Sequence, residues 1–102
     1  MDFEKARIIM QQPGDDRVFR LIRAAATICS PENADKVPIK ELLQCLKRGN
    51  ERREYKLVAE YAAMALYRRT NRYRKPEALP YEDFITDADD WLSYLKQHQF
   101  IA

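Results

Sequence analysis

The sequence has few of the residues from which most catalytic and metal sites are built. Its 102 residues include only two glycines, two cysteines and one histidine. Two isolated glycines do not make the glycine-rich loop that cradles phosphates in nucleotide-binding proteins. Cys29, Cys45 and His98 are too far apart to resemble the ligand spacing of a zinc site. Neither cysteine belongs to a CxxC pair, so we interpret both as reduced core residues, with a disulfide between them as the alternative.

The same scarcity argues against an enzyme. No serine or cysteine stands beside His98 in a recognisable pattern, so the sequence pairs no nucleophile with a base. Asp87, Asp89 and Asp90 would point in different directions on a helix, which favours a solvated charge cluster over an acid–base pair or a metal cage. We therefore predict a non-enzymatic protein that needs no cofactor and no metal.

Long apolar runs are also absent, and none approaches the ~20 residues that a membrane span needs. The first twelve residues lack the basic-then-apolar layout of a secretion signal. Hydrophobic residues make up 46% of the chain and charged residues 33%, which is typical of a globular protein and not of a disordered one. These features predict one domain over residues 1–102, located in the cytoplasm and without a membrane partner.

What the chain does contain favours helices. Alanine, leucine, arginine and glutamate outnumber the β-branched residues, and apolar residues recur at helical spacing. We predict an all-α fold, a compact single-domain bundle of about five helices around a central helix 51–74. The other helices are expected over 2–11, from Asp15 or Asp16 to about 29, over 38–48, and from Thr86 onward.

Turn-forming and polar residues mark the expected helix boundaries. Gly49 is expected to take the left-handed conformation that ends a helix, and Asn50 to cap the helix that follows. Such a short break predicts that the helices on either side pack against each other. The other signals are Pro13-Gly14 as a turn, Asp15 or Asp16 as a cap, and Thr86 with Asp89 as a capping box.

The stretch 57–67 carries one charged residue, Glu60, and four alanines, which indicates a helix covered by neighbours on most sides. Projecting its apolar stripe forward brings Arg68, Arg69 and Arg72 onto the same side. We therefore expect the central helix to overhang the core with a cationic end. Arg68 and Arg72, four residues apart on such a helix, would repel each other unless an anion lay between them.

The basic end of this helix is the best candidate for a binding surface. Residues 67–75, YRRTNRYRK, interleave two tyrosines with five cations. Arginines can bind phosphates and tyrosines can stack on exposed bases, although a basic helix end is also commonly just solvated. The candidate residues for nucleic-acid or partner binding are Arg52, Arg53, Arg68, Arg69, Arg72, Tyr73, Arg74 and Lys75. Arg20, Arg23, Lys40, Lys47 and Arg48 would extend this surface if they lay on the same side.

Charge is distributed unevenly along the chain. Residues 41–75 hold ten Lys or Arg against four acids, and residues 76–102 hold six acids against one lysine. The basic region and the acidic stretch 82–90 are complementary, so they can pair within one molecule or between molecules. Tyrosine and arginine are common at binding surfaces. Tyr55, Tyr73, Tyr81 and Tyr94, which have no obvious place in the core, are candidates for such a surface.

Two functions follow from these patterns. The leading hypothesis is a small helical accessory subunit that contacts nucleic-acid backbone within a larger assembly. In size, helicity and charge the chain resembles small subunits of bacterial nucleoprotein assemblies, including those of CRISPR surveillance complexes. The alternative is a protein–protein adaptor or a self-assembling module that sets its basic helix end against acidic surfaces. The expected partners are thus nucleic acid, other protein subunits or both, and a homo-oligomer is compatible with either function.

Overall fold

The computed structural model describes residues 1–12 and 17–102, except for the side chains of Glu77 and Tyr81. This part of the chain contains five α-helices and no strand, which confirms the predicted all-α bundle. Its radius of gyration is 12.5 Å, close to the ~13 Å typical of a 100-residue domain. The helices are α1 (Phe3–Gln11), α2 (Val18–Ile28), α3 (Ile39–Asn50), α4 (Lys56–Thr70) and α5 (Ala88–Gln97). The turn predicted at Pro13-Gly14 and the cap predicted at Asp15 or Asp16 lie outside the described residues.

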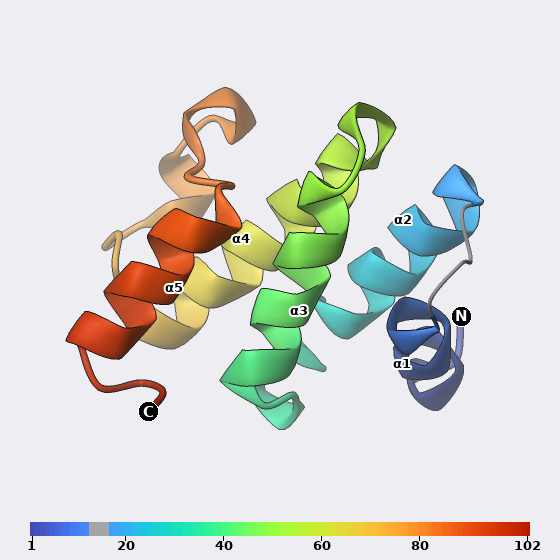
Figure 1. Ribbon diagram of the computed structural model, residues 1–102, viewed down its shortest axis with the longest axis horizontal. Coiled ribbons are helices and arrows are strands. Elements are labelled where there is room, and N and C mark those ends of the chain that lie inside the picture. Colours follow the sequence, from blue (N-terminus) through green and yellow to red (C-terminus); the bar gives the residue numbers. More distant parts are fainter. Residues whose placement is uncertain (13–16) are drawn as a thin grey trace.

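Helix α4 lies at the centre of the bundle. Figure 1 shows it passing behind α3, with α1 and α2 at one end of the molecule and α5 at the other. The most extensive helix–helix contact joins α3 to α4, and the next joins α1 to α2. The side chains of Ala62, Ala63, Ala65 and Leu66 are completely buried. Small alanine side chains let neighbouring helices approach α4 closely, which explains why all four alanines of the stretch 57–67 are buried in the core.

Gly49 shows how close this packing is. A Cβ atom placed on Gly49 would lie 2.4 Å from the backbone nitrogen of Ala59, so no larger residue fits between α3 and α4. The prediction of a left-handed turn at Gly49 is wrong, because this residue lies inside α3, which continues to Asn50. Glycine is required here by the space between two helices and not by the conformation of the chain.

The side chain of Asn50 also has a different role from the one predicted. It does not cap α4; it joins the end of α3 to the start of α5. The Asn50 Nδ2 donates a hydrogen bond to the carbonyl oxygen of Thr86 at 2.8 Å, and its Oδ1 accepts one from the backbone N–H of Ala88 at 2.8 Å. The predicted capping box at Thr86 is wrong as well, because Asp87 is the N-cap of α5 and accepts from the backbone N–H of Asp89 at 2.9 Å.

The central helix is shorter than the predicted range 51–74. It begins at Lys56, after a 3₁₀ turn, η2 (Arg53–Tyr55), whose Tyr55 is only 1% exposed. Tyr55 is therefore a core residue, and its prediction as a surface residue is wrong. The helix ends at Thr70 because Asn71 takes the left-handed conformation, with φ of 54°. Asparagine adopts this conformation more readily than most residues, and it turns the chain away from the helix axis.

An aromatic cluster holds the chain between α4 and α5 in place. The Tyr67 ring packs edge-on against Trp91, with ring centroids 5.0 Å apart, and also contacts Phe84. The Tyr67 hydroxyl accepts a hydrogen bond from the backbone N–H of Ile85, and Trp91 Nε1 donates to the carbonyl oxygen of the same residue. This loop contains two 3₁₀ turns, η3 (Pro76–Ala78) and η4 (Tyr81–Asp83), and a further turn, η1 (Ala34–Lys36), precedes α3. The cluster therefore fixes where the basic and acidic segments of the second half of the chain lie.

Candidate nucleic-acid interface

The structure separates the predicted binding residues into three groups. Two arginines are anchored inside the molecule, four residues form an exposed tip, and two arginines line a cleft elsewhere. The anchored pair is Arg69 and Arg72; the tip residues are Arg68, Tyr73, Arg74 and Lys75; and the cleft residues are Arg52 and Arg53.

Arg69 stabilises the fold. It lies in the last turn of α4 and is half-buried, and its Nη1 donates hydrogen bonds to the carbonyl oxygens of Ala34, at 2.7 Å, and Val37. These carbonyls belong to the segment that precedes α3, and the Ala34 carbonyl also accepts a hydrogen bond from the backbone N–H of Val37 at 3.4 Å. Hydrogen bonds to a charged donor are stronger than those between neutral groups. The Nη1 group of Arg69 is therefore engaged within the fold, and the role of Arg69 in binding stays a prediction.

Arg72 is anchored by two rings and a carboxylate. Its Cζ lies 4.7 Å from the centroid of the Trp91 ring and 4.4 Å from that of Tyr94, and its Nη2 is 2.8 Å from Asp90 Oδ1. Its Nη1 has no hydrogen-bond partner among the described residues, and the faces of the two rings supply an electrostatic contact in place of one. Arg72 follows the left-handed Asn71, so it does not extend the stripe of Arg68 as predicted. Its partner Asp90 shows that basic and acidic segments pair within one molecule here.

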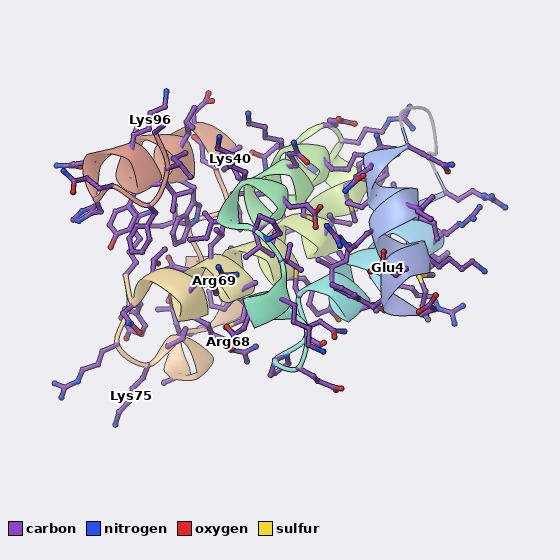
Figure 2. The ribbon with its side chains drawn as sticks, turned by 90° about the horizontal axis from the view of Figure 1, so that it is seen from below. Glu4, Lys40, Arg68, Arg69, Lys75 and Lys96 are labelled. Carbon is purple, nitrogen blue, oxygen red and sulfur yellow. The ribbon has the colours of Figure 1, made fainter. Side chains whose placement is uncertain are left out.

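The other residues of this end face solvent, and we call Arg68, Tyr73, Arg74 and Lys75 the basic tip. Figure 2 shows Arg68 and Lys75 at the outer edge of the molecule, whereas Arg69 lies against its body. Within residues 1–12 and 17–102, no ion pair involves the three cations of the tip. Tyr73 is 42% exposed and its ring packs edge-on against Tyr67, with centroids 6.4 Å apart. The tip is therefore a cationic surface with a supported, partly exposed ring.

Arg52 and Arg53 lie at the opposite end of α4, which at ~1.5 Å per residue is a helix of about 22 Å. With Lys56 they line an open cleft of ≈ 510 Å³ between the α3–α4 connection and the start of α5. Arg52 lies over the Tyr55 ring at 5.7 Å and 4.0 Å from Glu54, while Asp87 adds an acid to the cleft wall. The structure therefore does not unite these arginines with the basic tip.

The sequence reasoning missed a basic groove between α3 and α5, which has a volume of ≈ 250 Å³. Lysines from both helices surround it, and Figure 2 shows Lys40 and Lys96 projecting at the same edge of the molecule. We call this site the α3–α5 groove; its lining includes Lys40, Leu43, Lys47, Leu92, Lys96 and Ile101. The spacing of Lys40, Leu43 and Lys47, at i, i+3 and i+7 on α3, was a readable signal in the sequence. Lys96 becomes their neighbour only through the tertiary packing of α5.

The exposed Phe19 was missed too. It precedes the buried stripe of α2 and faces solvent, where basic side chains surround it. The signal in the sequence was a phenylalanine set between arginines at positions 17 and 20.

His98, at the end of α5, stacks on Tyr94 with centroids 4.2 Å apart. No group of three or more metal-ligating side chains occurs among the described residues. None of the helices described combines the length and apolar character needed to cross a bilayer. Comparison with protein family models, curated proteins and solved structures finds no match.

Proposed function

We propose that this protein is a non-enzymatic accessory subunit that binds nucleic-acid backbone through the basic tip, within a larger assembly. The observation that carries the proposal is the division of labour among neighbouring arginines. Arg69 and Arg72 bind inward to carbonyl oxygens, rings and a carboxylate, while Arg68, Arg74 and Lys75 face outward without an ion pair among the described residues.

Because Arg69 and Arg72 are anchored, the basic tip should bind phosphate more tightly than a flexible basic tail. A backbone that is already fixed loses little conformational freedom on binding, so more of the interaction energy remains as affinity. Tyr73 adds a ring that is held by Tyr67 and still 42% exposed. Such a ring can stack on an unpaired base next to the phosphates that the cations bind.

Three phosphate contacts predict a definite dependence on salt. The logarithm of the association constant should fall against the logarithm of the salt concentration with a slope of about −2.7 for duplex DNA and about −2.1 for a single strand. Fluorescence anisotropy with labelled oligonucleotides would measure both slopes. The affinity at physiological salt should be modest, because three contacts are few for a nucleic-acid-binding protein.

Charge reversal at the tip tests the proposal, and the α3–α5 groove offers a matched control. We expect Arg68→Glu/Arg74→Glu/Lys75→Glu to weaken oligonucleotide binding strongly, and Lys40→Glu/Lys47→Glu/Lys96→Glu, with the same change of charge, to weaken it only modestly. Circular dichroism should show unchanged helicity in both variants, since every residue concerned is exposed. Equal loss of binding in the two variants would indicate a response to net charge and would refute a site at the tip.

A second candidate function is an adaptor that binds an acidic protein segment in the α3–α5 groove. This groove supports the alternative because its described lining combines three lysines with apolar residues and contains no acidic side chain. Size-exclusion chromatography with light scattering and binding of an acidic peptide distinguish the two functions. Peptide binding or self-association that is lost in the groove variant, together with no binding to oligonucleotides, would favour the adaptor.

A further inference from the structure

A third basic surface lies at the other end of the molecule, on α1 and α2. It is an open hollow of ≈ 320 Å³ lined by Met1, Lys5, Arg17, Phe19, Arg20 and Arg23, and we call it the Phe19 hollow. Four of these six residues are cationic and none is acidic. The residues that line it belong to the α1–α2 end of the molecule, and Figure 1 shows this end far from the loop that follows α4. It is therefore a separate surface from the basic tip.

Phe19 has no role in the core. It is 81% exposed, the largest exposed fraction among the exposed large hydrophobic residues of the described chain. The buried side of α2 carries Leu21, Ala25 and Ile28, and Phe19 is about 200° around the helix from Leu21, at 100° per residue. One exposed apolar residue is ordinary on a protein surface. Packing in the core does not explain an aromatic ring that is almost fully exposed and has cations beside it.

The cations around the ring differ in how they are engaged. Arg17 and Arg20 already interact with other groups of the molecule. Within the described residues no ion pair involves the side chains of Lys5 or Arg23, which are both exposed. Lys5 comes from α1 and Arg23 from α2, so a ligand in the hollow meets cations from two elements. The hollow thus favours a ligand that carries both negative charge and a flat apolar face.

We propose that the Phe19 hollow binds single-stranded nucleic acid, with an unpaired base stacked on Phe19 and the adjoining phosphates bound by Lys5 and Arg23. The ligand class rests on the proposed function, whereas the site and the preference for a single strand are new. A duplex hides the faces of its bases, so only a single strand can use the ring. The hollow is less suited to lipid insertion, because Met1 and Phe19 are the only apolar residues among the described residues of the lining.

Substitution of Phe19 separates stacking from other apolar contacts. Phe19→Leu keeps an apolar side chain without a ring face, and Phe19→Trp keeps the ring. With a labelled oligothymidine of about 15 nucleotides, a length that a small binding domain can cover, we expect Phe19→Leu to weaken binding about fivefold or more. Phe19→Trp should bind like the wild type. The melting temperature of both variants should match the wild type, because the side chain is 81% exposed.

The charge variant Lys5→Glu/Arg23→Glu should also lose single-strand affinity and reduce the salt slope by about 1.4. Wild-type affinity in Phe19→Leu would overturn the proposal, as would binding to anionic phospholipid vesicles without any binding to the oligonucleotide. The experiments distinguish failure of the proposal for the basic tip from failure of the proposal for the Phe19 hollow. If only the charge-reversed basic tip loses binding, the proposed function stands and the Phe19 site is refuted; if only the Phe19 hollow variants lose it, the tip is refuted and the Phe19 site stands.

Discussion

Replacing Arg72 with alanine should destabilise the fold more than any other change to the predicted basic set except the loss of Arg69. Two aromatic rings and Asp90 surround this guanidinium, and only 18% of its side-chain surface is exposed. The variant removes contacts that join the end of α4 to α5. It therefore tests whether the arginine is a structural residue or a ligand-binding one.

The magnitude follows from the contacts. Each cation–π contact contributes about 0.5–1 kcal/mol at an exposed site and ~2 kcal/mol when desolvated. The pair with Asp90, whose side chain is 46% exposed, adds about 0–1 kcal/mol. The sum of these contributions is about 1–5 kcal/mol. A value near the middle of this range, roughly 2–3 kcal/mol, lowers the melting temperature of a domain of this size by roughly 8–24 °C. The two rings supply most of this contribution. Arg72→Lys should therefore also lose most of the contribution of Arg72, since lysine lacks the planar guanidinium that stacks on the rings.

Urea denaturation of four variants measures this effect. Arg72→Ala and Arg72→Lys should both lower the free energy of unfolding. Asp90→Asn should lower it by less than about 1 kcal/mol. The exposed Arg74→Ala should leave it within about 0.5 kcal/mol of the wild type. If Arg72→Ala were as stable as Arg74→Ala, the anchoring of Arg72 would be refuted. The division of the arginines into inward and outward groups would then fail with it.

Three further predictions concern stability. Gly49→Ala should cost roughly 2–3 kcal/mol in urea denaturation, because the new methyl group meets the Ala59 backbone, which cannot rotate away as a side chain can; wild-type stability would show that α3 and α4 can separate cheaply. Asn50→Ala should cost about 1–2 kcal/mol, measured in the same way, because two hydrogen bonds to the start of α5 are lost; no loss would mean that water replaces the amide. A hydrogen bond to Cys29 and burial raise the pKa of Cys45 well above its ordinary value of 9.0. The resulting contribution to stability is present in full below about pH 9, and it is lost as the pH rises further, because the thiol ionises first in the unfolded chain. The melting temperature should therefore fall above about pH 9, less steeply in Cys45→Ala; identical pH profiles would refute this.

The sequence predicted the fold well because helical periodicity is local. The apolar stripes of α1, α2 and α5, and the buried alanines of α4, can each be read within a few turns of chain. The errors lie where one residue serves two elements. Gly49 and Asn50 resemble a helix end in sequence, but their roles are set by Ala59 and by the start of α5. No local pattern contains that information.

The candidate site shows the same limit more strongly. Residues 67–75 correctly mark a basic region, yet their spacing suggests one continuous cationic face. A single left-handed residue, Asn71, divides them, and tertiary contacts then take Arg69 and Arg72 inward. The complementary acids of the last third were visible in the sequence. Which of them would meet an arginine was not, because the answer depends on how Trp91 and Tyr94 stack around Arg72.

The central claim is that the cations of the basic tip bind phosphates directly. The most direct measurement is the salt dependence of oligonucleotide binding for the wild type and for a tip with neutral side chains, Arg68→Gln/Arg74→Gln/Lys75→Gln, which retains residual affinity that can be titrated. The account predicts that the slope for a single strand becomes shallower by about 2 in the variant. Equal slopes in the two proteins, or no binding by the wild type at low salt, would contradict it.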